Sequence, residues 1–386
     1  MIFSRYLAIC RLPEYSFTWK PVFFIFPRRA FSKWIFLAVL NEIDNFIWGP
    51  PLLVLLVGTG ILLTIRLHLL QIFKLPKALS LIFRAQNAGS GDIDSFKALC
   101  TALSATVGTG NIVGVATAIH AGGPGALFWM WMAAFFGMAT KYAEGLLAVK
   151  YRETDEKGEI AGGPMYYIKN GMGEKYKWLG GLFAFFGVLV AYFGIGTFAQ
   201  VNSIVDITKM TIGLDPVWTG AILTIFVAAI TIGGLQSIAA AASRIVPAMA
   251  FIYFLSTIGV LLVFADKVPA AVSMIFESAF TTTAATGGFL GATVMMAMRN
   301  GVARGVFSNE SGLGSAPIVA AAAKTKWPAE QGLISMTGTF YRHHCYLYPD
   351  RLTLVVTGVW CGMENGAALT NAAFTPRFLF SADTCC

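Results

Sequence analysis

Two glycine-interrupted segments carry the residues of this chain that could do chemistry. The first, residues 96–122, contains Ala-Thr-Val-Gly-Thr-Gly-Asn at 105–111. The second, residues 269–298, contains Ala-Ala-Thr-Gly-Gly-Phe-Leu-Gly at 284–291. Glycine and threonine weaken a helix, and backbone groups freed by a break inside a membrane must find partners or line a cavity. Such breaks can bind an anion at a half-helix N-terminus and a cation at unwound carbonyl groups.

The composition places these segments in a membrane. Hydrophobic residues make up 56% of the 386 residues and charged residues only 12%, whereas a soluble domain has about 25% charged residues. An ordinary soluble enzyme, a disordered chain and a disulfide-stapled secreted module are therefore excluded. The six cysteines show no paired spacing, so we expect neither a disulfide framework nor a zinc site. The net charge of +8 fits Lys- and Arg-rich cytoplasmic loops, and nothing indicates binding of nucleic acid.

Apolar stretches of about 20 residues, long enough to cross a bilayer, recur along the chain. They predict an all-α, polytopic membrane protein with about eight spans. Placing the basic loops in the cytoplasm gives a consistent zigzag that starts outside. The candidate spans are residues 46–65, 96–122, 126–149, 179–204, 217–234, 245–265, 269–298 and, imperfectly, 336–360.

The two breaks match each other. A glycine-rich helix on its own is also explained by close helix packing through small residues. Sliding the second segment by 180 positions, however, places Thr286 on Thr106 and Gly288 on Gly108. The zigzag gives the two segments opposite directions, and this pattern indicates an inverted-repeat secondary transporter. The G-x-G-x-x-x-G spacing at 108–114 lacks the βαβ context of a dinucleotide fingerprint.

The motifs around these breaks resemble those of the sodium:alanine/glycine symporter family, over residues 41–339 and again 352–374. The resemblance implies a LeuT-like inverted-repeat fold, with one peripheral helix before two five-helix repeats. It also implies sodium-driven uptake of alanine or glycine by a multi-pass protein of the plasma membrane. The motifs are Trp-Gly-Pro at 48–50, Gly-Thr-Gly at 58–60, Gly-Pro-Gly-Ala-Leu-Phe-Trp-Met-Trp-Met at 123–132, Gly-Met-Ala-Thr-Lys at 137–141, Gly-Gly-Pro-Met-Tyr-Tyr at 162–167 and Ser-Asn-Glu-Ser-Gly-Leu-Gly-Ser-Ala-Pro at 308–317.

The resemblance assigns substrate contacts to both breaks. In the first, the backbone N–H groups of Gly108, Thr109 and Gly110 would bind the substrate carboxylate. Gln200, an amide alone in an apolar span, is either a substrate contact or an interhelical hydrogen-bond partner. The second break would hold the amine and cover the ligand through Thr286, Gly287, Gly288 and Phe289.

Sodium, the co-transported ion, is given two sites by the same resemblance. The Thr106 carbonyl and the Asn111 side chain would bind one ion. The carbonyls of Ser104 and Val107 would supply half of a second site. Oxygen ligands suit this hard cation, because carbonyl dipoles can replace its hydration shell.

Other polar residues have simpler interpretations. Lys141 and Glu144 lie one helical turn apart, which predicts a partly screened ion pair. Glu310 and Ser311 predict a helix cap rather than a ligand.

Three segments depart from the family pattern. Residues 1–36 place basic residues on the outer side, and we interpret them as a non-family N-terminal extension from an upstream start. Residues 340–351 are basic, aromatic and Pro-interrupted where a span is expected. Their His343–His344 pair suggests a metal site, but one allowed codon set, read one base later after Phe340, encodes IDTIVICTLT. We therefore interpret this segment as a local frameshift, and residues 375–386 as a non-family tail.

The expected domain order follows from these boundaries. A peripheral transmembrane helix at 46–65 precedes a first five-helix repeat at 96–265 and the start of a second repeat at 269–374, disrupted at 340–351. The fold is expected to be incomplete, with about eight of eleven spans.

The leading function is import of a small neutral amino acid together with sodium ions across the bilayer. One alternative is an inactive, truncated product of the same family. Another is an integral membrane enzyme, but the chain has no H-E-x-x-H, no G-x-S-x-G and no carboxylate pair within one span, so no enzyme activity is expected. Alanine versus glycine, and sodium versus proton coupling, stay open at this stage.

Overall fold

The computed structural model describes residues 38–40, 42–44, 46–83, 89–156, 158–193, 195–282, 293–342, 347–362 and 366–375. Two compact units divide the chain, Met1–Ile47 and Trp48–Cys386. The first contributes helical residues at 38–40 and 42–44. All elements named below belong to the second unit.

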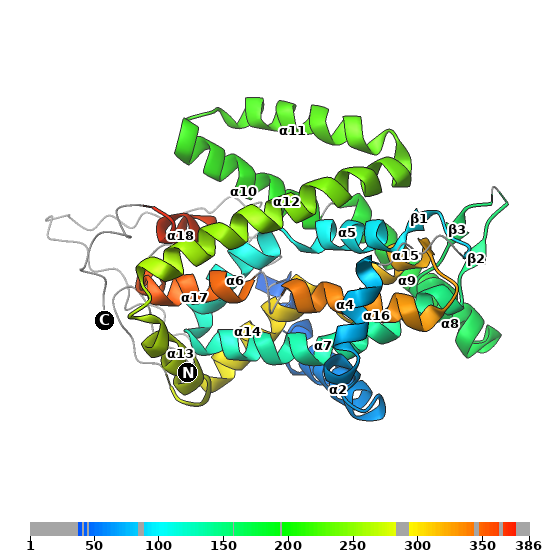
Figure 1. Cartoon of the computed structure of the whole chain (residues 1–386), viewed down its shortest axis with the longest axis horizontal. Coiled ribbons are helices and arrows are strands. Elements are labelled where there is room, and N and C mark those ends of the chain that lie inside the picture. The colour runs from blue at the N-terminus through cyan, green and yellow to red at the C-terminus, as the bar shows by residue number, and fades with distance from the viewer. Residues whose placement is uncertain are drawn as a thin grey trace, which may run out of the picture. The chain divides into compact units, whose positions relative to one another are not determined.

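The second unit is built from helices, with four two-residue strands at its loops (Figure 1). β1 (Ile93–Asp94) pairs in parallel with β4 (Ala323–Lys324), and β2 (Glu153–Thr154) pairs antiparallel with β3 (Ile160–Ala161). The α-helices are α2 (Pro50–Arg66), α3 (Leu70–Phe73), α4 (Leu75–Phe83), α5 (Ser95–Thr106), α6 (Thr109–Gly122), α7 (Gly125–Lys150), α8 (Pro164–Met172), α9 (Lys177–Tyr192), α10 (Ile195–Ile212), α11 (Pro216–Thr231), α12 (Gly234–Val263), α13 (Val268–Phe280), α14 (Val294–Asn309), α15 (Ala316–Ala321), α16 (Pro328–Phe340), α17 (Leu347–Val356) and α18 (Gly366–Ala373).

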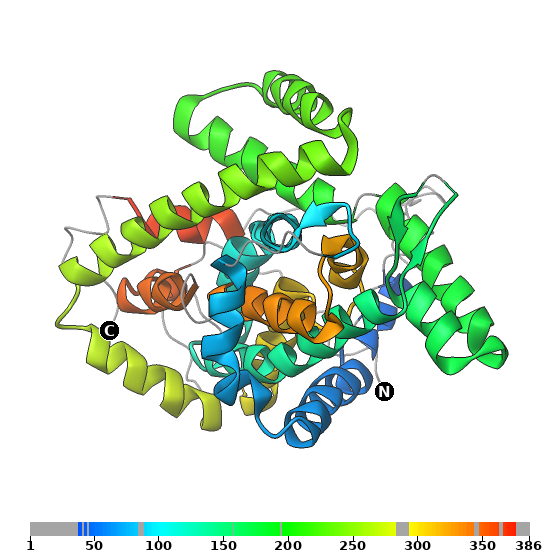
Figure 2. The same cartoon turned by 45° about the vertical axis from the view of Figure 1, so that its right-hand side comes forward.

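Helix α7 is the element on which several others pack. Helices α2, α13, α14, α15 and α16 all contact it, and Figure 2 shows α16 and α14 beside it. Glycines allow the close approach: an ideal Cβ on Gly125 would lie 2.2 Å from the Ser278 carbonyl oxygen, and one on Gly301 would lie 2.3 Å from the Ala126 carbonyl oxygen. Close packing through small residues is therefore a real feature of this chain.

The largest hydrophobic core joins α7 to the helices at one end of the unit. Its members come from α6, α7, α12, α13, α17 and α18. Ile119, Leu127, Met130, Ile275 and Leu354 are fully buried in it. The core fixes α6 against α7, and so fixes the position of the helix break that precedes α6.

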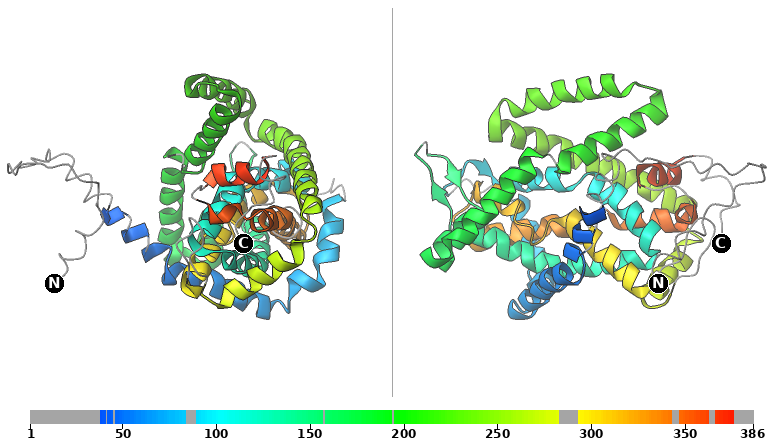
Figure 3. Two further views of the ribbon diagram at one scale, coloured as in Figure 1. Left: turned by 90° about the vertical axis from the view of Figure 1, so that its left-hand side faces the viewer. Right: turned by 180° about the vertical axis from the view of Figure 1, so that it is seen from behind.

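Helix α11 and the adjoining ends of α10 and α12 form an arch that projects from the packed helices (Figure 3), whereas α12 also packs against α5 and α17. Large apolar side chains on α11 face outward, with Ile225 69% and Phe226 67% exposed. A surface of this kind is unfavourable in water and suits hydrocarbon.

Two stretches of the described chain are long and apolar enough to cross a membrane, Glu174–Ile212 and Gly234–Val263. A third qualifies if α5 and α6 form one bent span, and α2, α11 and α13 are shorter apolar helices. An integral membrane protein is thus supported, while the count of eight spans stays a prediction.

The segment expected to be disrupted, residues 340–351, is described except for residues 343–346. Helix α16 ends at Phe340, a π-type turn follows at residues 341–342, and α17 begins at Leu347. Asp350 and Arg351 are fully buried, and the Tyr253 hydroxyl donates a hydrogen bond to the Asp350 carboxylate. Within residues 340–351, the charged side chains of Arg342, Asp350 and Arg351 are thus buried in the protein. His343 and His344 lie outside the described residues.

The contact between α7 and α14 provides a test of the fold. We expect Gly301→Ala to destabilise the protein by about 1–3 kcal/mol, because its Cβ meets backbone atoms that must shift. The matched control is Gly259→Ala on α12, where a Cβ has no neighbour within 4 Å, so helix propensity alone should leave stability unchanged or raised. Thermal unfolding in detergent measures both. Equal melting temperatures for the two variants would contradict the packing of α14 on α7.

Candidate functional site

The first glycine-rich segment forms two helices separated by a break, as predicted. Helices α5 and α6 meet at an angle of 43°. The helical ladder of α5 ends with the Val107 N–H bonded to Leu103 O at 2.6 Å and resumes in α6 with the Asn111 N–H bonded to Gly108 O at 3.0 Å. The Ser104 carbonyl therefore lies outside this ladder. The Thr106 hydroxyl donates to Ala102 O at 2.9 Å, a back-bond that bends helices.

The break places a helix N-terminus where the substrate carboxylate was predicted to bind. Gly108 is the N-cap residue of α6, and Thr109 is its first residue. The first N–H groups of a helix have no partner within it, and the helix dipole adds partial positive charge there. The backbone of Gly108, Thr109 and Gly110 thus has the chemistry that the prediction requires.

Gln200, on α10, lies beside this N-terminus. An ideal Cβ built on Gly108 would be 3.3 Å from Gln200 Nε2 and 3.7 Å from its Oε1. The structure thus brings together two of the residues assigned to the substrate. It also gives a reason for glycine at 108, because any side chain there would meet the Gln200 amide.

Thr106 and Asn111, predicted to share a sodium ion, are in direct contact. Asn111 is fully buried, and its Nδ2 donates to the Thr106 carbonyl at 2.7 Å. This hydrogen bond links the last residue of α5 to the first turn of α6 across the break. In this arrangement the two groups bind each other.

Two residues that the sequence did not single out complete the contacts of Asn111. Its Oδ1 accepts from the Ser308 hydroxyl and from Arg342 Nε at 2.9 Å. Arg342 Nη2 also donates to Ser308 Oγ at 3.3 Å. Ser308, in the last turn of α14, opens the 308–317 motif, which was the available signal. Arg342 lies in the π-type turn after α16, inside the segment interpreted as frameshifted, and nothing in the sequence indicated a site role.

The second glycine-rich segment cannot be compared with the first. Thr286, Gly287, Gly288 and Phe289 lie outside the described residues. Its flanks are described: α13 ends at Phe280 and α14 begins at Val294, with α14 packed against α6 and α7.

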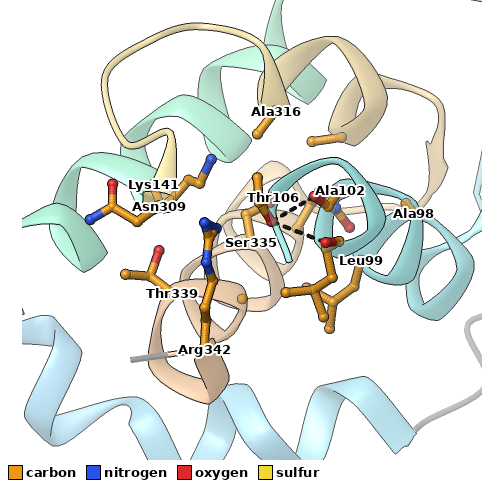
Figure 4. Close-up of a pocket in the computed structure, with 14 residues that line it drawn as sticks. Ala98, Leu99, Ala102, Thr106, Lys141, Asn309, Ala316, Ser335, Thr339 and Arg342 are labelled. Atoms are coloured by element: carbon orange, nitrogen blue, oxygen red, sulfur yellow. Dashed lines mark hydrogen bonds between the residues drawn. The ribbon is translucent and has the colours of Figure 1, made fainter. Parts of the chain in front are cut away.

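A small cavity lies next to the break (Figure 4). Its volume of about 30 Å³ is enough for one water molecule or a monatomic ion, but not for an amino acid. Polar side chains on its wall include Thr106, Lys141, Asn309, Thr339 and Arg342.

A second, more open hollow of about 390 Å³ lies on the other side of α6. Its lining is largely apolar and comes from α6, α10, α12 and α18, with Ile112, Ser203 and Tyr253 among its residues. Ile112 follows Asn111 directly, so this hollow also lies next to the break. It is larger than the first cavity.

The predicted ion pair between Lys141 and Glu144 is wrong. Ion pairs within 4.0 Å among the described residues do not include it. Both side chains are more than nine-tenths buried, and both bind the loop after α14 instead. Lys141 Nζ donates to Glu310 O at 3.3 Å, and Glu144 Oε1 accepts from the N–H groups of Gly312 at 3.2 Å and Gly314 at 3.3 Å. Tertiary contact overrides the i, i+3 spacing.

The expected cap at Glu310 and Ser311 is present at the C-terminal end of α14. Glu310 is the C-cap residue, with a left-handed φ of +52°. The Ser311 N–H donates to Asn309 Oδ1 at 2.8 Å, and the Ser315 hydroxyl donates to the Glu310 carboxylate at 2.5 Å. The loop that follows α14 is thereby fixed, and Ser308 is held at its position.

Comparison with known families identifies the chain. A model of the sodium:alanine symporter family matches residues 33–382. The chain belongs to this family. Membership confirms the resemblance drawn from the sequence motifs, and it places the chain among transporters rather than in an enzyme family.

Several relatives align over most of this symporter-family chain. An uncharacterised transporter of Haemophilus influenzae is 56% identical over 338 residues, which cover 87% of this chain and 74% of the relative. The sodium/alanine symporter AgcS of Methanococcus maripaludis is 50% identical over 347 residues, covering 88% and 76%. The probable sodium/glutamine symporter GlnT of Bacillus subtilis is 38% identical over 302 residues, covering 78% and 61%.

Glu144 allows a test of how the loop after α14 is held. We expect Glu144→Ala to lower stability by about 1–3 kcal/mol, because the N–H groups of Gly312 and of the buried Gly314 lose their acceptor. Glu144→Gln keeps an oxygen at that position and should lose less. Thermal unfolding in detergent would compare the two, and equal losses would show that the two amide contacts are not what Glu144 contributes.

Proposed function

We propose that this chain is a sodium-coupled symporter that imports a small neutral amino acid, alanine or glycine, across the plasma membrane. The observation that carries the proposal is the break between α5 and α6, in a chain of the sodium:alanine symporter family. The relative named as a sodium/alanine symporter, 50% identical, supports alanine. The relative named as a probable sodium/glutamine symporter is more distant, at 38%.

The substrate carboxylate binds at the N-terminus of α6. Its partners are the N–H groups of Gly108, Thr109 and Gly110, and Gln200 lies close enough to contact a ligand bound there. Thr286, Gly287, Gly288 and Phe289, from the second break, hold the amine and cover the ligand. The glycines allow the substrate to approach the backbone closely.

Sodium binds at carbonyl oxygens freed by the break. Ser104 and Val107 provide part of one site, and the Ser104 carbonyl lies outside the helical ladder in this structure. The family resemblance gives the other position to Thr106 and Asn111, which bind each other in this structure. A cation next to the bound carboxylate couples the two solutes electrostatically. The LeuT-like inverted repeat supplies alternating access, in which one helix bundle rocks against a scaffold.

Uptake into proteoliposomes tests the proposal directly. The purified chain should accumulate labelled alanine when sodium is higher outside than inside, and accumulation should stop when a sodium ionophore collapses the gradient. Unlabelled glycine should compete, and glutamine should compete less. Uptake no greater than in empty liposomes, by protein shown to be folded, would refute the proposal and favour the inactive alternative. Equal competition by glutamine would refute the substrate assignment.

A glycine variant tests the location of the carboxylate site. Gly110→Leu should reduce alanine uptake at least 100-fold, because the side chain fills the space in which the backbone meets the carboxylate. Gly187→Leu on α9 is the matched control, since a Cβ there has no neighbour within 4 Å, and it should transport normally. Normal uptake by Gly110→Leu would remove the N-terminus of α6 from the binding site.

A further inference from the structure

The oxygen of Asn111 has no free lone pair in this structure. An amide oxygen accepts two hydrogen bonds, and Asn111 Oδ1 receives one from the Ser308 hydroxyl and one from Arg342 Nε at 2.9 Å. The amide nitrogen is a donor and is bonded to Thr106 O at 2.7 Å. No group of this side chain is left to bind an ion.

The group that fills the position is itself a cation. The Arg342 guanidinium is positively charged at every pH that a protein survives, and Arg342 is only 2% exposed. Its second contact, from Nη2 to Ser308 Oγ at 3.3 Å, fixes the orientation of its planar group. The guanidinium thus binds Asn111 Oδ1 as a sodium ion would, and it cannot leave.

A second positive charge lies in the same region. Lys141 and Arg342 both line the cavity beside the break, and Figure 4 shows the Arg342 side chain extending from the turn after α16 toward Lys141. Like charges repel, and they do so more strongly where water is excluded. A sodium ion at Asn111 would have to enter next to both cations, which share Glu310 as a neighbouring carboxylate.

We propose that Arg342 acts as a tethered cation that replaces sodium at Asn111 in this chain. The inference rests on the proposed function only in taking the break as the solute-binding site. Sodium coupling then uses other ligands, for which the Ser104 and Val107 carbonyls are the candidates. Arg342 accordingly determines how many sodium ions bind, because its guanidinium group permanently occupies one of the two expected sodium positions.

Equilibrium binding of radioactive sodium to the purified full chain, without amino acid, tests this. Arg342→Gln removes the charge, and Arg342→Asp, the residue that the shifted reading frame would encode, adds a carboxylate ligand. Arg342→Lys keeps the charge. Arg304→Gln, at an exposed position on α14, is the control for the loss of one positive charge elsewhere.

We expect Arg342→Gln and Arg342→Asp to bind sodium at least ten-fold more tightly, or to bind one more ion, and a second substitution Asn111→Ala to remove that gain. Arg342→Lys and Arg304→Gln should bind like the unmodified chain. Asn111→Ala alone should change sodium affinity less than two-fold, since Asn111 binds no sodium when Arg342 is present.

Two results would overturn the inference. One is a loss of sodium affinity of ten-fold or more in Asn111→Ala alone. The other is unchanged sodium binding in Arg342→Gln and Arg342→Asp that are folded by gel filtration and circular dichroism. If neither Arg342 variant folds, the sodium affinity of Asn111→Ala alone decides whether the inference stands: a change of less than two-fold supports it, and a loss of ten-fold or more overturns it. Failure of alanine uptake would refute the proposed symport, but it would leave these sodium measurements readable, because they involve no amino acid.

Discussion

The bent span formed by α5 and α6 depends on one side chain, Asn111. A break in a membrane helix frees N–H and C=O groups that have no water to bind. Asn111 meets this constraint for one group, because its nitrogen binds Thr106 O at 2.7 Å, and its oxygen connects the break to the side chains of Ser308 and Arg342. Residues 111, 308 and 342 are far apart in sequence, so the break and the packing of α14 and α16 form together.

Helix α7 brings Ser308 of α14 and Arg342, which follows α16, close enough to contact Asn111. Both α14 and α16 lie against it, and its small residues set their distance. A Cβ on Gly145 would lie 2.5 Å from Ser335 Oγ on α16, and one on Gly137 would lie 3.0 Å from Ser311 Oγ. Only glycine allows the neighbouring elements so close. The motifs around residues 123–141, which carried the family resemblance, therefore contribute to this packing through Gly137, and their Lys141 also lines the cavity beside the break.

The sequence predicted what depends on local physics and missed what depends on tertiary contact. Glycine and threonine at 106–110 predicted the break, and apolar runs predicted the helices around it. Gln200 was singled out as a lone amide and does lie beside Gly108. The i, i+3 spacing of Lys141 and Glu144 predicted a pair that does not form, because the loop after α14 offers each a backbone partner. No local pattern could place Arg342 next to Asn111.

Charge and apolar surface are separated in this chain, and the separation limits how it can move. On α11 the Ile225 and Phe226 side chains are 69% and 67% exposed, whereas Lys141, Glu144 and Arg342 are buried and bonded to protein atoms. Leaving one partner of a buried charged contact alone costs about 3–5 kcal/mol. A rearrangement that opens the site must therefore carry α7 and the loop after α14 together, since each holds the other's buried polar groups. Helix α11 contributes none of these buried charged groups, and it packs against α10 and α12.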